Sequence, residues 1–412
     1  MSMRNMFSQF ATVCGRPLIS MLALAFALDA IATTGSQAAE QPAAAPIAAV
    51  APLRPPAASA KNGVRWTGAA KVLAGMRVPA THELAEFSDR KSVVQHRLEF
   101  DRAWGKFAAE RLKPVGAFAT TELIGSASAG PLYYPFSGPD ILYALALFPQ
   151  ATEYVLTGLE PVGDVPDLSK LDEEQTIGSL AQLRRSLNAM LAFSFFKTND
   201  MREEFANNKL SGVTPILLIF LARHQATISA VEPFVLEKDG NLRLTTTWSH
   251  YNLPSGRIPG VRITFAVPAE PHERKLYYFT ADISDSGLAT TPQYLNWVQA
   301  YAPQVTFIKS ASYLMHKSYF SRVRSFILDR SNLVLQDDSG IPLRLFAEQA
   351  WDRKMYGAYA GPIPLFSNWY QSDMKAAYDK AAMPIDFGIG YQHVSKRSNL
   401  QVFVRRGPRT TS

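Results

Sequence analysis

The residues "LYYPFSGPDILYALALFPQATEYVL" (132–156) carry the strongest structural signal in this chain. They predict a short apolar strand, a capped helix, a proline that ends the helix, and a second apolar strand. Ser137 is the expected helix cap, and Asp140, three residues later, completes a capping box. Two strands joined through a helix are typical of parallel pairing, so the stretch predicts an α/β fold.

A similar pattern recurs downstream. "GAFATTELIGSASAGPLYYPF", from Gly116, aligns without a gap with "GVRITFAVPAEPHERKLYYFT", from Gly260, and five of the 21 positions are identical. A helix and a strand follow in both copies, with "ALFPQATEY" matching "AYAPQVTFI". Each copy is expected to form a hairpin followed by strand–helix–strand–helix–strand. The pattern predicts two related α/β units that arose by internal duplication.

The composition divides the chain into five segments. Arg4 and Arg16 precede an apolar stretch and the small residue Ala38, which is typical of a secretory signal peptide. An Ala/Pro-rich stretch follows, and such a composition predicts a poorly ordered spacer. The expected segments are a signal peptide at 1–38, a disordered Ala/Pro linker at 39–63, a helical lead-in at 64–115, the first α/β unit at 116–240 and the second at 241–408.

The cysteine content points to an exported protein. Cys14 is the sole cysteine and lies within the predicted signal peptide. A mature chain without cysteine excludes disulfides, thiol nucleophiles and thiolate metal sites, which suits a bacterial periplasm. The longest later apolar run, residues 214–222, is too short to cross a bilayer. We therefore expect a periplasmic or secreted protein with no transmembrane span after signal cleavage.

The net charge of +7 is concentrated at the C-terminal end. Residues 387–412 contain no acidic residue. Nucleic-acid binding would require basic residues spread over one face, so we expect no nucleic-acid partner. A basic end predicts either a solvated tail or a contact with an anionic component of the envelope. The basic residues in question are Lys396, Arg397, Arg405, Arg406 and Arg409.

The predicted topology selects candidate site residues. In an open parallel sheet, ligands bind beyond the carboxyl ends of the strands, so the loops after predicted strands are the candidates. Aromatic side chains beside carboxylates can stack on sugar rings. The ligand-binding candidates are Ser137, Asp140, Asp200, Asp282 and Asp285, with Trp248 and Tyr251 as aromatic platforms. The catalytic candidates are Asp337 and Asp338 with His316 or Glu160.

Each candidate also has a structural interpretation. Asp140 fits a helix cap, and "DDSG" at 337–340 fits a turn. A lone histidine such as His316 is often simply hydrogen-bonded. In the functional interpretation, the adjacent carboxylates Asp337 and Asp338 share a divalent metal or raise one another's pKa.

Three functions remain open at this point. The leading hypothesis is non-covalent binding of a polar small molecule or glycan in a cleft between the two units. The second is a hydrolase, in which Asp337 and Asp338 act with or without a divalent metal. The third is a structural protein of the envelope. The chain contains no P-loop, GxGxxG or HExxH motif, so no cofactor is evident.

Overall fold

The computed structural model describes residues 60–123, 130–193, 212–246, 253–268, 270–300, 305–393 and 397–407. The predicted signal peptide and nearly all of the predicted linker lie outside these residues. Helix α2 begins at Ala60, so residues 60–63 of the expected linker are helical. No helix in the described ranges combines the length and apolar character that a bilayer span requires.

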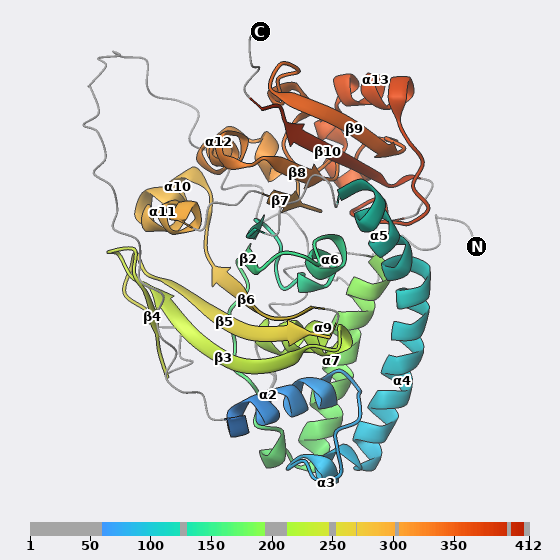
Figure 1. Cartoon of the computed structure of the whole chain (residues 1–412), viewed down its shortest axis with the longest axis vertical. Coiled ribbons are helices and arrows are strands. Elements are labelled where there is room, and N and C mark those ends of the chain that lie inside the picture. The colour runs from blue at the N-terminus through green and yellow to red at the C-terminus, as the bar shows by residue number, and fades with distance from the viewer. Residues whose placement is uncertain are drawn as a thin grey trace, which may run out of the picture. The chain divides into compact units, whose positions relative to one another are not determined.

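Ten strands in the described residues form one mixed sheet, drawn in Figure 1. Its order is β4-β3-β5-β6-β2-β1-β7-β8-β10-β9. The strands are β1 (Leu132–Tyr134), β2 (Glu153–Gly158), β3 (Thr227–Leu236), β4 (Leu242–Leu244), β5 (Ile258–Val267), β6 (Glu270–Thr280), β7 (Val305–Ile308), β8 (Leu333–Gln336), β9 (Trp351–Gly357) and β10 (Asn399–Arg405). The expected α/β class is therefore confirmed.

The centre of the sheet is parallel and its two sides are antiparallel. The parallel part contains, in order, β6, β2, β1, β7 and β8. The antiparallel pairs include β3–β5 and β5–β6 on one side, and β8–β10 and β10–β9 on the other. The two predicted units do not form separate sheets. Strands β1 and β2 of the first unit lie between β6 and β7 of the second, so the units share one sheet.

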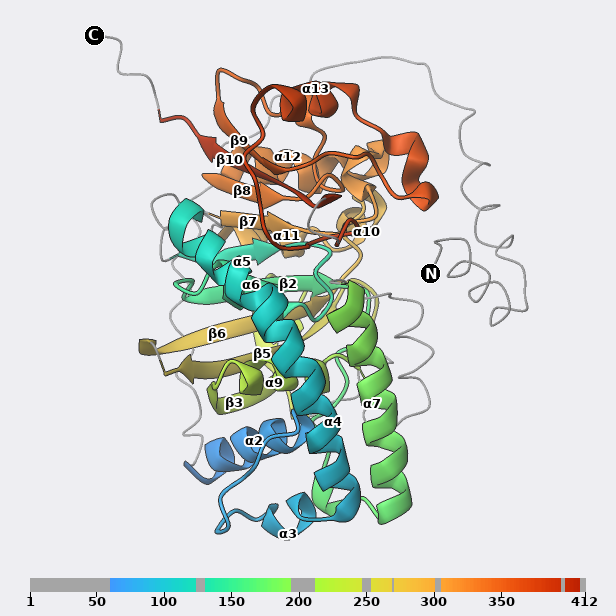
Figure 2. The same cartoon turned by 90° about the vertical axis from the view of Figure 1, so that its right-hand side faces the viewer.

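Helices cover both faces of this sheet, because its strands alternate between two hydrophobic cores. Leu132 and Tyr134 of β1 face one core and Tyr133 faces the other. Figure 2 looks onto the first helical layer, where α4 and α7 lie side by side. This layer comprises α2 (Ala60–Leu73), α3 (Ala85–Ser88), α4 (Lys91–Phe107), α5 (Lys113–Phe118), α6 (Ile141–Leu147), α7 (Glu173–Phe193) and α9 (Thr214–Arg223). The second comprises α10 (Asp285–Thr290), α11 (Gln293–Ala300), α12 (Ser321–Arg330) and α13 (Ser372–Ala381).

The direction of the crossovers opens a crevice at one edge of the sheet. The connection from β1 through α6 to β2 runs toward β6, whereas the connection from β6 through α11 to β7 runs the opposite way. Right-handed crossovers in opposite directions place their helices on opposite faces, and α6 and α11 do belong to opposite cores. The chain leaves β1 for α6 and leaves β7 for α12, and these two helices also belong to opposite cores, which leaves space beyond the carboxyl ends of β1 and β7.

The predicted hairpin at the start of the first unit is wrong. Gly116 lies in α5, and a π-helical segment, η2 (Ala119–Leu123), continues the helix. Val115, Phe118, Ala119 and Leu123 are buried at the spacing of one helical face. This spacing allows the segment to pack as a helix, whereas its counterpart after Gly260 forms the β5–β6 hairpin. The third predicted strand of the first unit also begins as helix, because α7 extends to Phe193.

Part of the basic C-terminal end is tied into the fold. Arg405 lies in β10, and its Nε donates a hydrogen bond of 2.9 Å to the carbonyl oxygen of Ser331. Arg406 forms an ion pair of 2.8 Å with Asp352. Arg405 is therefore anchored in the fold, whereas Arg406 is exposed and forms a surface ion pair. Lys396 and Arg409 lie outside the described residues, and a contact with the envelope stays a prediction.

Candidate functional site

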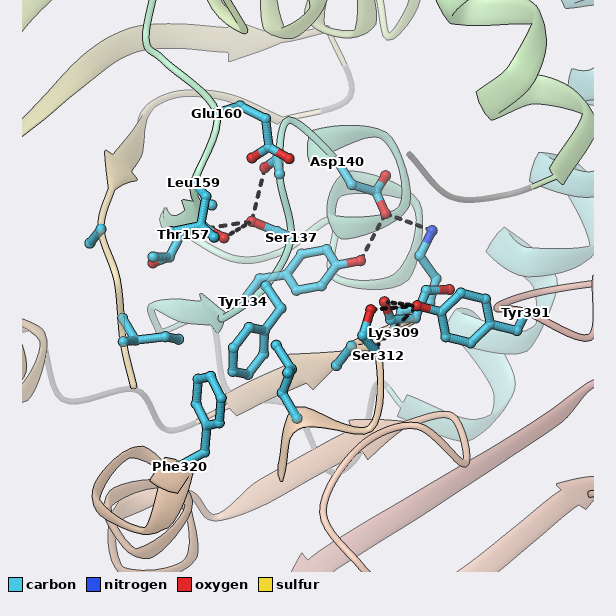
Figure 3. A pocket seen from close by; sticks show the side chains of 18 of the residues that line it. Tyr134, Ser137, Asp140, Thr157, Leu159, Glu160, Lys309, Ser312, Phe320 and Tyr391 are labelled. Carbon is cyan, nitrogen blue, oxygen red and sulfur yellow. Dashed lines mark hydrogen bonds and ion pairs between the residues drawn. The ribbon is translucent and has the colours of Figure 1, made fainter. Parts of the chain in front are cut away.

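A cavity of about 530 Å³ lies at the carboxyl ends of β1, β2, β6 and β7 (Figure 3). Its walls come from the loops that follow these four parallel strands and from two later segments. The cavity occupies the crevice that the opposite crossovers create, which is where an open α/β sheet usually binds its ligands. Residues from both predicted units line it.

Buried polar side chains form one part of the cavity lining, and we call this part the floor. The side chains that define the floor all belong to residues that are at most 6% exposed. They come from β1, β2, β7 and the loops that follow these strands. The floor residues are Tyr134, Ser137, Asp140, Thr157, Glu160 and Lys309.

Asp140 and Lys309 form a buried ion pair in the floor. Asp140 is the N-cap residue of α6, and its Oδ1 accepts a hydrogen bond of 3.1 Å from the backbone N of Tyr143. Its Oδ2 accepts a hydrogen bond of 2.8 Å from the Tyr134 hydroxyl and lies 2.7 Å from Lys309 Nζ. Burial lowers the pKa of Lys309, and the Asp140 carboxylate opposes that shift. Both side chains are only 2% exposed, so the pair adds little net charge to the floor.

Ser137 joins two loops of the floor and is not the helix cap that the sequence predicted. Its hydroxyl accepts a hydrogen bond of 3.0 Å from the backbone N of Thr157 and lies 2.9 Å from the carbonyl oxygen of Gly138. These bonds fix the loop after β1 against the end of β2. Asp140 lies directly before α6 and takes the capping role.

Glu160 is held in the floor by residues of β6. The Tyr278 hydroxyl lies 3.1 Å from Glu160 Oε2 and 3.0 Å from the Glu160 carbonyl oxygen, and the Thr280 hydroxyl donates to the same carbonyl at 2.8 Å. A Cβ at Gly158 would lie 2.3 Å from Oε2 and 2.6 Å from the Tyr278 hydroxyl, so a larger residue here would displace the Glu160 carboxylate and the Tyr278 hydroxyl. Figure 3 shows the carboxylate directed toward the loop of Ser137.

Strained backbone is concentrated in two loops of the cavity. Five non-glycine residues in the described ranges have positive φ, and four of them lie in these loops. They are Phe136 (58°), Ser310 (52°), Ser312 (51°) and Tyr313 (54°), and the fifth is Gln225 at the end of α9. Such conformations cost free energy and cluster at functional sites.

Asp337 and Asp338 hold the strained loop after β7. Asp337 Oδ2 accepts a hydrogen bond of 2.8 Å from the backbone N of Ser310, and the Tyr313 hydroxyl donates to Asp338 Oδ2. The backbone N of Ser339 donates to Asp337 Oδ1 at 3.0 Å. Burial raises the pKa of both carboxyls, and the charge of Asp338 further raises that of Asp337. Neither acid lines the cavity, so the structure gives the pair a positioning role.

Ser310 has a buried hydroxyl with unmet hydrogen-bonding capacity. Its Oγ has no hydrogen-bond partner among the described residues, although it is shielded from solvent. Its neighbours are satisfied: the Tyr391 hydroxyl donates to the Ser310 carbonyl oxygen at 2.9 Å and shares a hydrogen bond of 3.0 Å with the Ser312 hydroxyl. Ser310 and Tyr391 both line the cavity. Neither Ser310 nor Tyr391 was among the residues predicted from the sequence, most of which are acidic.

The mouth of the cavity is mainly apolar, and we call it the rim. Leu365 is 76% exposed and Leu159 is 59% exposed, although both line the cavity. The other rim residues are the half-buried Phe136, Leu314, Ile363 and Phe366. Polar side chains outside the floor also line the cavity. They are the half-buried Ser310, Ser312 and Tyr391, and the exposed Asp282, whose Oδ1 accepts a hydrogen bond of 2.9 Å from the backbone N of Ser284.

The remaining candidates lie away from the cavity or outside the described residues. His316 belongs to η4 (Leu314–His316), where its ring centroid lies 5.2 Å from that of Tyr313 and 5.5 Å from that of Trp369. Burial, with a contribution from the charge of Arg344, lowers the pKa of His316 to about 4. It does not line the cavity.

Asp285 caps a helix instead of lining the cavity. Its carboxylate accepts hydrogen bonds from the backbone N of Ser321 (3.1 Å) and of Arg322 (2.9 Å) at the start of α12. Asp200, Trp248 and Tyr251 lie outside the described residues. Ser137, Asp140, Glu160 and Asp282 are therefore the sequence candidates that line the cavity.

The described residues contain no group of three or more His, Cys, Asp or Glu side chains arranged to hold a metal ion. A divalent metal at Asp337 and Asp338 stays a prediction of the hydrolase hypothesis.

Comparison with known proteins gave no relative for this fold and cavity. No protein-family model, no curated protein and no solved structure matches the chain.

Proposed function

We propose that the cavity binds a small, polar, hydroxyl-bearing molecule, such as a sugar, without covalent chemistry. The observation that carries this proposal is Ser310, whose strained backbone places a buried hydroxyl without a partner in the cavity wall. From the N-terminal sequence we also infer that the protein is exported and that this binding takes place outside the cytoplasm.

The energetic cost of Ser310 supports a role in binding. A buried polar group without a partner costs about 1–3 kcal/mol, and backbone strain adds a comparable amount. Asp337 holds this conformation through its hydrogen bond to the Ser310 backbone. Rotation of the Ser310 side chain toward the cavity would let a ligand hydroxyl supply the missing hydrogen bond. The Glu160 carboxylate is an acceptor for a second hydroxyl or an amino group.

The observations favour binding over the two alternatives. A hydrolase that uses Asp337 and Asp338 would need these acids in the cavity wall, whereas both are engaged in holding the loop after β7. His316 lies in an aromatic cluster away from the cavity. A purely structural envelope protein would have no use for a strained loop beside a cavity.

Calorimetric titration with a panel of neutral sugars and polyols tests this proposal. We expect Ser310→Gly to bind the best ligand about tenfold more weakly than wild type, because one hydrogen bond is lost. Gln225→Gly is the matched control, since Gln225 also has positive φ but lies outside the cavity. The proposal is wrong if no member of the panel binds, or if Ser310→Gly binds as tightly as Gln225→Gly.

A further inference from the structure

The cavity lining combines buried charged side chains with exposed leucines, although the apolar Ile283 and Ala311 are also buried and Asp282 is exposed. Its floor buries a carboxylate–ammonium pair and a second acid, Glu160, which is 4% exposed. Its rim exposes Leu365 and Leu159 by 76% and 59%. Solvent favours the opposite arrangement, because burying charged groups is costly and exposing apolar side chains forfeits the hydrophobic effect. An occupant that covers the rim would remove the cost of exposing its leucines.

We propose that the ligand is an amphiphile, whose hydroxylated head occupies the floor and whose apolar chain lies across the rim. This inference rests on the proposed function and names its ligand class. The head meets Ser310 and Glu160, and the chain covers Leu159 and Leu365.

The origin of the rim residues supports one apolar chain as the occupant. They come from four segments far apart in the sequence: the loops after β1, β2 and β7, and the 3₁₀ segment η7 (Pro364–Trp369) with the adjacent Ile363. All of them line the same cavity as the floor, so one molecule in the cavity contacts both. The volume of about 530 Å³ is also that of a small-molecule site.

Phe136 gives independent support. This bulky residue adopts a φ of 58°, a conformation that is rare for large side chains. Its ring packs edge-on against Phe320, with centroids 5.6 Å apart, and both residues line the cavity. The strain therefore places an aromatic surface at the rim, where an apolar chain can pack on it.

A series of alkyl β-glucosides with methyl, butyl, hexyl and octyl chains tests this inference. Binding is measured calorimetrically below the concentration at which each compound forms micelles. We expect affinity to rise by about three- to fourfold per added methylene, until the chain extends beyond the rim. Octanol, which has the chain but not the sugar, is expected to bind more weakly than octyl glucoside.

Two matched variants test whether the alkyl chain binds at the rim. Leu365→Gln is expected to weaken binding of the octyl compound by about tenfold and to leave the methyl compound unchanged. Leu98→Gln, at a leucine of α4 that is 59% exposed and outside the cavity, is expected to change neither.

The outcomes separate this inference from the proposed function. Equal affinity for the methyl and octyl compounds would overturn the amphiphile and leave polar binding intact. Equal affinity for octanol and octyl glucoside would overturn the polar floor and both proposals with it, as would no binding by any compound. If Leu365→Gln changes only the sedimentation behaviour of the protein, a second copy of the chain covers the rim and the amphiphile is wrong.

Discussion

The floor and the rim of the cavity differ in how their side chains are satisfied. On the floor, Asp140 bonds to Lys309, to the Tyr134 hydroxyl and to the backbone of α6, all within the free protein. On the rim, Leu365 is largely exposed. The floor is therefore a preorganised polar site, because interactions within the free protein already offset the free-energy cost of burying its charged groups. The rim leaves apolar side chains exposed to solvent. We infer that the protein itself orders the polar floor, whereas the ligand covers the apolar rim.

The largest expected effect concerns the floor. Asp140→Asn and Lys309→Met are each expected to lower the free energy of unfolding by about 3–5 kcal/mol, because each leaves a buried charge without its partner. The double variant should cost less than the sum of the two, because neither charge then remains. Urea unfolding measures all three.

A rim variant provides the contrast. Leu159→Ala should change stability by no more than about 0.5 kcal/mol, as is usual for an exposed position. If the single floor variants lose less free energy of unfolding than Leu159→Ala does, the proposed difference between floor and rim is wrong.

The second effect is a loss of folding stability at low pH through His316, which packs beside the rim. His316 packs against Trp369 of η7, the segment that carries Leu365. Its pKa in the folded protein is lowered to about 4 from 6.5, so the unfolded chain binds its proton more readily between these values. Stability that is present above pH 6.5 is therefore lost as the pH falls toward 4, by at most about 3 kcal/mol at 1.36 kcal/mol per pKa unit.

The variant His316→Phe isolates this contribution, because it keeps an aromatic ring and removes the titrating group. Chemical unfolding at several pH values should show wild type losing stability more steeply than the variant between pH 6.5 and 4. Parallel curves for the two proteins would mean that His316 is not the titrating group.

The third effect has the opposite sign. Ser310→Gly is expected to raise the free energy of unfolding by about 1 kcal/mol more than Gln225→Gly does, because both relieve positive φ but only the first removes a buried hydroxyl without a partner. Thermal and urea unfolding of the two variants give the comparison. Equal changes in both would show that the Ser310 hydroxyl finds a partner in solution.

Local sequence signals were sufficient to predict the part of the fold that holds the floor. The residues 132–156 predicted the order β1, α6, β2, and Pro149 marks the end of α6 correctly. The rule that ligands bind at the carboxyl edge then selected Asp140 and Glu160, which line the cavity. The sequence could not distinguish Asp140 from Ser137 as the cap of α6, because both residue types are good helix caps.

Other features depend on contacts that a sequence does not display. Lys309 would be expected at the surface, and it is buried only because Asp140, from a distant loop, lies opposite its ammonium group. The segment after Gly116 was predicted as a strand because it resembles the Gly260 segment. It forms a helix, as the helical spacing of its apolar residues indicates. The exposure of Leu365 depends on how η7 meets the loops after β2 and β7.

A crystal structure of the protein with octyl β-glucoside tests the central claim most directly. The predicted result is a sugar hydroxyl within hydrogen-bond distance of Ser310 Oγ, with the alkyl chain passing between Leu159 and Leu365. A glucoside bound elsewhere, with the cavity unoccupied and the Ser310 hydroxyl still without a partner, would contradict the account.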